Sequence, residues 1–196
     1  SHQIEKVDVY SINADFYGNI AQGHSLSYGL EWTYNKIRSQ GYSLDLVLDL
    51  ENIISYTNRT MIPSRYPSDG SSANSFAGYL NWIYKANDRL TINGGLRLTS
   101  SKIVARWNDS AQIDKLLTTV DLQSDALTYT LAMTYRPDEK WQINSLISSG
   151  FRNPNIDDIG KIRENNGILL VPNSFLKPEY AYTLESGIKY TSSNKI

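Results

Sequence analysis

Alternation of apolar and polar side chains is the feature that most constrains how this chain can fold. One segment shows it clearly, with apolar residues spaced by two, namely Leu26, Tyr28, Leu30, Trp32 and Tyr34. Successive side chains of a β-strand point to opposite faces, so a period of two predicts a strand with one apolar and one polar face. The same pattern predicts seven strands, at 7–17, 25–35, 75–84, 90–99, 127–135, 141–150 and 179–190.

The connections between these segments alternate in length. They are short after Tyr17, Tyr84, Tyr135 and Tyr190, and long at 36–74, 100–124 and 152–178. Outer-membrane barrels have short periplasmic turns and long extracellular loops, whereas a soluble sandwich has no reason to separate its connections by length in this way. We therefore expect an all-β fold, namely part of an antiparallel up-and-down transmembrane β-barrel with long extracellular loops.

Aromatic residues cluster at both ends of the predicted strands. Those on the apolar face beside the short turns are Phe16, Trp82, Tyr84, Tyr135, Trp141 and Tyr190, and those beside the first long connection are Trp32, Tyr34 and Phe76. Amphipathic rings prefer the headgroup level of a bilayer, so two such clusters indicate two girdles. Aromatic residues also fill the cores of soluble sheets, so a soluble β-sandwich or lipocalin-like binding module stays open as an alternative.

Composition excludes several classes of function. The 196 residues suffice for one domain or a piece of a larger one. No signal peptide opens the chain, which we interpret as a cytosolic protein or an excised fragment. The formal charge of −1 provides no basic stripe, so we expect no nucleic acid partner. The chain has no Cys and hence no disulfide framework.

The sequence motifs give no support to an enzyme. The two histidines, His2 and His24, form no ligand cluster, and no nucleophile elbow, phosphate-binding loop or dinucleotide-binding motif is present. Asp157 and Asp158 are adjacent, but adjacent loop carboxylates usually point apart and are solvated, whereas glycoside hydrolysis needs two acids held across a cleft. We therefore expect no enzyme activity, no resident cofactor and no metal site.

The stretch 149–190 carries the most specific signal. It contains Phe151-Arg152-Asn153-Pro154 and, after a polar connection, Val171-Pro172-Asn173-Ser174-Phe175-Leu176. These segments resemble the paired FRAP and NPNL boxes of TonB-dependent outer-membrane receptors, most of all the haemin and haemoglobin receptor branch. The segments 65–71 and 88–97 are similar to a loop motif and a hairpin of the same receptors. The resemblance covers most of the chain, from about residue 13 to residue 190.

This resemblance implies that residues 1–196 form an interior piece of a large receptor barrel, with about a third of its strands and without its N-terminal plug domain. It implies a place in the bacterial outer membrane, contact with outer-membrane lipid, and coupling to the TonB complex through the absent plug region. The extracellular ligand would be haem, an iron-siderophore or a similar scarce nutrient. A passive outer-membrane porin stays open as an alternative.

The resemblance also supplies the candidate site. The box residues that would shape the extracellular loop and its strand ends are Phe151, Arg152, Pro154, Pro172, Asn173 and Leu176. The candidate substrate-binding residues are Arg152, Asn153 and Asn173, and Arg152 best suits an anionic ligand or a neighbouring loop, because a guanidinium fork matches carboxylates. The chain departs from the motifs of these receptors in two ways. Asn153 stands where the family usually has Ala. No His occurs between Phe151 and Leu176, which argues against axial haem ligation by a His of this loop.

Two further elements are predicted inside the long connections. The alternation in 43–50 predicts a strand that extends beyond the membrane, and 109–117 has the pattern of one or two capped helical turns.

Overall fold

A computed structural model describes residues 2–49, 52–62, 64, 66–107, 119–159, 163–165 and 168–192. The helical turns predicted for 109–117 lie outside the described residues, as does Leu50 at the end of the strand predicted for 43–50.

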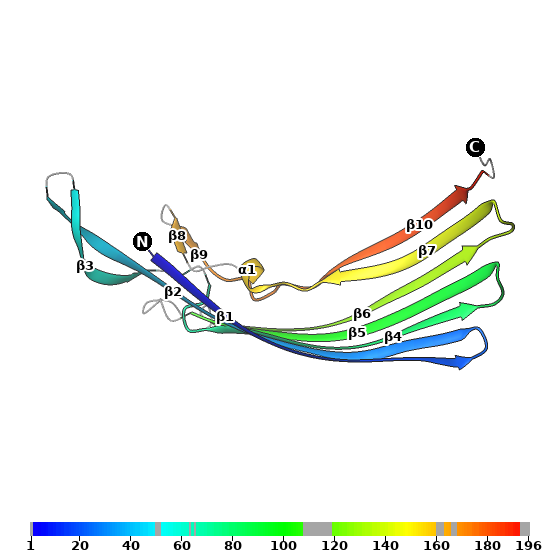
Figure 1. The fold of residues 1–196 in the computed structure, drawn as a ribbon. Coiled ribbons are helices and arrows are strands. Elements are labelled where there is room, and N and C mark those ends of the chain that lie inside the picture. Colours follow the sequence, from blue (N-terminus) through cyan, green and yellow to red (C-terminus); the bar gives the residue numbers. More distant parts are fainter. Residues whose placement is uncertain are drawn as a thin grey trace.

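Most of the described residues form one curved antiparallel sheet that does not close on itself (Figure 1). Its strands, in spatial order, are β1 (His2–Ala21), β2 (His24–Asp49), β4 (Ser71–Lys85), β5 (Leu90–Arg106), β6 (Thr119–Tyr135), β7 (Trp141–Arg152) and β10 (Glu179–Tyr190). An eighth strand, β3 (Asn52–Ile62), pairs only with the far end of β2. The prediction of seven antiparallel strands in sequence order is confirmed, and β3 is an addition to it.

Local side-chain chemistry explains why the short connections turn sharply. Gly23 has φ +75, and a Cβ there would lie 2.4 Å from the carbonyl oxygen of Lys85, so this turn requires glycine. In the next two turns, the side-chain oxygens of Asn87 and Asp138 each accept hydrogen bonds from the backbone amides two and three residues further on. Such Asx turns favour the sharp reversals seen in these hairpins.

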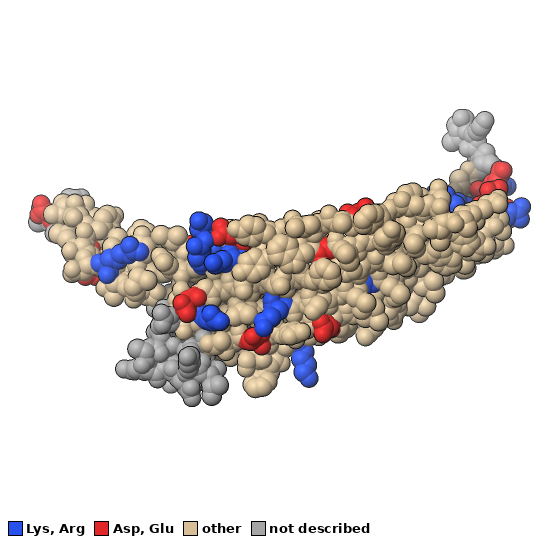
Figure 2. Space-filling model, turned by 90° about the horizontal axis from the view of Figure 1, so that it is seen from below, with Lys and Arg blue, Asp and Glu red and all other residues tan. Residues whose placement is uncertain are grey.

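The outer face of the sheet is the face opposite the side on which the helix α1 (Ile156–Ile159) lies in Figure 1. It carries a continuous apolar belt. Cross-strand register places Phe16, Tyr28, Leu80, Leu96 and Tyr129 in one row of this belt. These side chains are exposed, and no second sheet covers them among the described residues, unlike in a β-sandwich. Figure 2 shows charged residues over the half with the long connections and at the tips of the short turns, with few between.

Aromatic rings border this belt on the side of the short turns, as predicted. His24 stacks on Tyr84 with ring centroids 4.2 Å apart, and Trp141 contacts Tyr190 at 4.7 Å. The indole nitrogen of Trp82 donates to Nδ1 of His24, so this histidine is held within the aromatic row.

Beyond the belt, toward the long connections, the apolar side chains change face. Register places Ile37, Ala105 and Val120 in one row of the inner face, and Ile103 and Leu122 in the next. Ile103, Ala105 and Val120 are buried in a cluster that also contains Trp107, so the inner face has its own small core at this end. The prediction that 100–124 is a loop is therefore wrong in extent, because β5 continues to residue 106 and β6 begins at residue 119. The change of face interrupts the alternation on which that prediction was based.

The first long connection is also shorter than predicted. The strand predicted for 43–50 is confirmed as the end of β2, but 52–62 is a strand as well, and β4 begins at residue 71. Two register shifts, between Leu44 and Asp45 and between Val47 and Leu48, interrupt the pairing of β2 with β3. Asn58 is the extra residue of the first shift, and its backbone has a positive φ of 48°. Each bulge moves the following side chains to the other face, which hides a strand from a period-two search.

Candidate functional site

The connection between β7 and β10 folds back over the inner face of the sheet. It contains a short helix, α1 (Ile156–Ile159), and a small hairpin of β8 (Arg163–Asn165) and β9 (Ile168–Leu170). Ile156 and Ile159 are buried against the inner cluster of β5 and β6. Burial of these two side chains fixes the start of the connection on the sheet.

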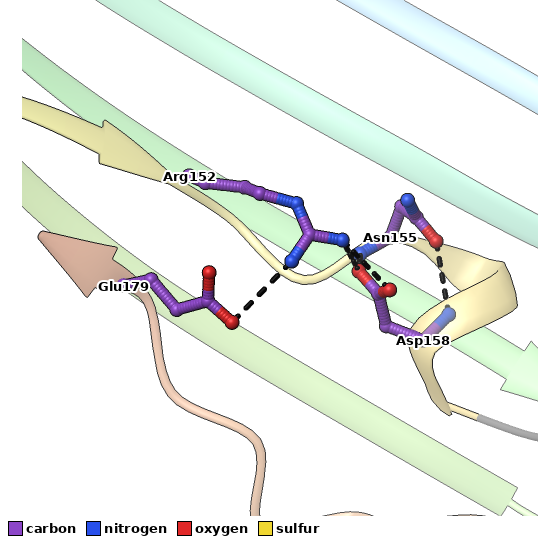
Figure 3. Close-up of polar contacts among 4 residues, drawn as sticks. All are labelled: Arg152, Asn155, Asp158 and Glu179. Atoms are coloured by element: carbon purple, nitrogen blue, oxygen red, sulfur yellow. Dashed lines mark hydrogen bonds and ion pairs between the residues drawn. The ribbon is translucent and has the colours of Figure 1, made fainter.

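Arg152, the last residue of β7, joins three parts of this corner (Figure 3). One guanidinium nitrogen donates to both carboxylate oxygens of Asp158, each at 2.7 Å, and another lies 3.4 Å from Glu179. Asp158 is in α1, and Glu179 is the first residue of β10 and the register partner of Arg152. The guanidinium therefore links both ends of the connection to the strand pair.

Asn155 and Asp158 also bond to each other. The backbone amide of Asn155 donates to the Asp158 carboxylate at 2.9 Å, and the backbone amide of Asp158 donates to the side-chain oxygen of Asn155 at 2.9 Å. This reciprocal pair is the arrangement of a capping box at a helix start. The pKa of Asp158 is lowered, first by the Asn155 amide and then by Arg152, although partial burial opposes the shift.

Asn153 bonds to the inner face of the sheet. Its amide nitrogen donates to Ser101 of β5 at 2.7 Å, and Ser124 of β6 donates to its side-chain oxygen at 2.9 Å. One amide thus joins the connection to two neighbouring strands. An alanine, the residue usual in the resembling receptors, could make neither bond.

The residues of the second box hold the returning part of the connection. Pro172 is buried, and Leu176 packs against the inner cluster. The backbone amide of Asn173 donates to the carbonyl of Ile159 at 2.8 Å, while its side chain accepts from the amide of Phe175 at 2.9 Å. These contacts attach the second box to the end of α1. Phe175 itself is 87% exposed.

A pocket of about 400 Å³ opens on the inner face beside this corner. The start of the connection and the strands β2, β4 and β5 line it, with apolar contributions from Ile37, Ile103 and Ile156. Tyr66, from the connection before β4, donates to Asp157 at 3.1 Å at the pocket margin. Two long connections that are far apart in sequence therefore meet here.

The structure brings only part of the predicted site together. Arg152 and Asn153 lie at one corner and Pro154 lines the pocket, whereas Asn173 lies at the other end of α1 and does not line it. Phe151 points to the outer face, where its ring centroid is 6.3 Å from that of Tyr180. Asp157 and Asp158 do take separate partners, but the expectation that both are simply solvated is wrong, because each accepts a hydrogen bond from a side chain.

Sequence reasoning missed Asp158 as the partner of Arg152. The signal that could have revealed it is the spacing of Asn155 and Asp158, since a polar side chain followed three residues later by an acid marks a helix start. Within the described residues, no group of three or more His, Cys, Asp or Glu side chains is placed to hold a metal ion.

Comparison with known proteins identifies the architecture. A family model described as TonB dependent receptor-like, beta-barrel, matches residues 2–195. Solved structures with the same fold include a copper transporter, OprC (TM-score 0.71, 16% identity, covering 97% of this chain and 29% of that one). The siderophore receptor PiuA from Acinetobacter baumannii gives a TM-score of 0.68 at 18% identity, covering 96% of this chain and 30% of that one.

A third similar structure is the Serratia marcescens hemophore receptor HasR, in a complex with its hemophore HasA and heme. Its TM-score is 0.66 at 19% identity, covering 95% of this chain and 30% of the receptor. The chain thus spans about three-tenths of the length of these three proteins. Among curated proteins, none matches the sequence. No helix in the described part of the chain is long and apolar enough to cross a membrane.

Proposed function

Because the chain belongs to the TonB dependent receptor-like β-barrel family, we propose that residues 1–196 form part of the barrel wall of an outer-membrane uptake receptor. Members of this family are receptors and transporters rather than enzymes. In this proposal the plug domain, and with it the contact to the TonB complex, belongs to parts of the receptor outside this chain.

The exposed apolar belt is the observation that carries this proposal. A soluble protein rarely leaves an apolar surface of this extent uncovered, whereas a barrel wall turns such a face to lipid. The belt has charged residues on the side of the long connections and aromatic rings on the side of the short turns. We therefore assign the outer face to membrane lipid, the long connections to the cell exterior and the short turns to the periplasm.

The inner face beside the β7–β10 connection is our proposed ligand-facing region. Arg152 and Asn153 hold the start of this connection against the wall, and Asn173 holds its return. The pocket beside them is lined by amide and hydroxyl groups and Asp157 as well as by apolar side chains, which suits a ligand with both polar and apolar surface. We propose that these three residues support uptake of a scarce nutrient such as haem or an iron-siderophore by fixing the shape of this surface.

An uptake measurement in cells tests this proposal. Arg152→Ala and Asn173→Ala, introduced into the intact receptor, are expected to lower uptake several-fold while the amount of assembled barrel stays constant. Lys177→Ala is the matched control, because Lys177 is exposed in the same connection and makes no ion pair among the described residues. Unchanged uptake in both site variants would remove the site assignment, and uptake that persists without the energised inner membrane would favour a passive porin.

A further inference from the structure

A polar notch flanked by two lysines lies on the outer face, directly beyond the apolar belt. Cross-strand register places Lys36 of β2 beside Ser72 of β4, and Lys102 of β5 beside Asn74 of β4. The short side chains of Ser72 and Asn74 therefore separate the two lysines. Neighbouring strands are about 4.8 Å apart and the two lysines are staggered by two residues, about 6.6 Å, along the strands, so their backbones are roughly 12 Å from each other. Both long side chains can reach one anion over β4.

The hydrogen-bonding groups of this notch are mostly donors. Trp32 donates its indole N–H to the side-chain oxygen of Asn74 at 2.8 Å, which leaves the amide NH₂ of Asn74 as the group that can face a ligand. Lys36 forms no ion pair with any residue that the structure describes, because the carboxylate of Asp8 opposite it pairs with Arg38. Two ammonium groups, an amide and a hydroxyl are a donor set that suits a phosphate.

Three carboxylates lie near this site: Asp8 beside Lys36, Asp121 beside Lys102, and Asp125 one row closer to the belt than Lys102. Lys102 lies 3.0 Å from Asp121, and both side chains are about half exposed, at 50% and 54%. A pair this open to water is weak, so a more highly charged phosphate can share or replace it.

The belt below the notch is hollowed along the same strand. Gly78 lies on the same face of β4 as Asn74, four residues further on, between Leu30 and Leu98 in the register. The missing side chain leaves shallow apolar grooves to either side, both of which include Gly78 and Leu98. Four residues of strand span roughly 13 Å, so the notch and the groove are separated by a distance that one lipid molecule covers.

We propose that this part of the outer face binds an acyl lipid with a phosphate in its headgroup. The phosphate lies in the notch between Lys36 and Lys102, and an acyl chain lies in the groove at Gly78. The proposal rests on the assignment of the belt to membrane lipid, and it adds a defined position and headgroup chemistry to it. A lipid is favoured over a free anion because only a lipid uses the notch and the groove together.

Lipid-dependent thermal stability of the purified intact receptor tests this inference. In neutral detergent micelles, dimyristoyl phosphatidic acid should raise the unfolding temperature in a saturable manner, whereas dimyristoyl glycerol, with the same chains and no phosphate, should have a much smaller effect. Replacing both lysines, Lys36→Gln with Lys102→Gln, should weaken the apparent affinity for phosphatidic acid roughly 25-fold, because each cation near a lipid surface contributes about fivefold. Lys140→Gln, in a short turn at the opposite end of the sheet, is the control.

Three results would overturn the inference. They are equal stabilisation by both lipids, an unchanged affinity in the double lysine variant, and an equal shift with inorganic phosphate alone, which would indicate a free-anion site. Gly78→Leu, which fills the groove without touching the lysines, should lower the affinity for phosphatidic acid but not the weak binding of inorganic phosphate. Assembly and nutrient uptake of the lysine variants are expected to match the wild type. A wild-type receptor that takes up its nutrient but does not distinguish the two lipids would therefore contradict this inference and leave the proposed function standing.

Discussion

The hydroxyl of Tyr79 donates a hydrogen bond to the carboxylate of Asp15 across an intervening strand. Asp15, Gly29 and Tyr79 are register neighbours on β1, β2 and β4, and the tyrosine ring passes over the glycine to reach the acid. A Cβ at Gly29 would lie 2.6 Å from the Ala14 carbonyl oxygen and 2.8 Å from the Tyr79 ring. The glycine is therefore what allows this contact on the inner face.

We expect Gly29→Ala to destabilise the receptor barrel by about 1–3 kcal/mol, because the new methyl group meets backbone and ring atoms that cannot both move away. The urea midpoint of the refolded receptor in detergent micelles measures this effect. Gly187→Ala is the control on the same kind of strand, since a Cβ at Gly187 meets nothing within 4 Å. Equal midpoints for the two variants would show that the close approach at Gly29 carries no energetic consequence.

The ion pair of Arg152 with Asp158 is expected to limit opening of the β7–β10 connection. Arg152→Gln and Asp158→Asn should each raise the rate of proteolytic cleavage within 153–178 several-fold. The double variant should be little worse than either single one, because both remove the same contact. Additive effects in this double-mutant cycle would mean that the two side chains act independently. Lys177→Gln, in the same connection, should cleave at the wild-type rate.

Acid should weaken the same attachment. The folded connection lowers the pKa of Asp158 below the ordinary Asp value of roughly 4, so its stabilising contribution is complete above that value. The contribution is lost as the pH falls through the lowered pKa. Hydrogen exchange of residues 155–159, corrected for intrinsic rates, should therefore be constant between about pH 7 and pH 5 and should show lost protection only below about pH 4. Asp158→Asn should remove this acid step, and an acid step that persists in the variant would assign it to another group.

Asn153→Ala should loosen the connection where it leaves β7. The variant loses the bonds to Ser101 and Ser124, each worth about 1 kcal/mol. The Ser101 hydroxyl still donates to Ser75, whereas the Ser124 hydroxyl loses its acceptor. We expect weaker ligand binding with an unchanged yield of assembled barrel, measured by titration of the purified receptor. Ser101→Ala removes only one of the two bonds, so it should give a smaller loss. Ligand binding equal to wild type in Asn153→Ala would show that this tether has no part in recognition.

The predictability of this fold from sequence depends on what surrounds each strand. Segments such as 25–35 and 127–135 alternate because one face is apolar and the other polar along their whole length, and the structure confirms them as strands. The pattern fails where the environment changes, at Ile103 and Val120, because there the connection after β7 covers the inner face with apolar side chains. A period-two search cannot detect a strand whose apolar face switches sides.

The candidate site was predictable in part for a similar reason. The position of Arg152 at a strand end follows from the alternation that ends near residue 150, and its suitability for carboxylates follows from its chemistry. Its actual partner depends on how residues 153–158 turn, and that turn is set by the bonds between Asn155 and Asp158 and by the burial of Ile156. The contact of Tyr66 with Asp157 joins residues 91 apart in sequence, and no local pattern announces it.

Spin-label accessibility at two adjacent residues tests whether the outer face of this sheet meets lipid. The chain contains no Cys, so Leu131→Cys on the outer face and Thr130→Cys on the inner face can each be labelled without background from these 196 residues. In the receptor reconstituted in bilayers, the label at 131 should collide mainly with oxygen dissolved in lipid, and the label at 130 mainly with a water-soluble nickel complex. A label at 131 that collides with the nickel complex as often as the label at 130 would show that the outer face is in water and not in lipid.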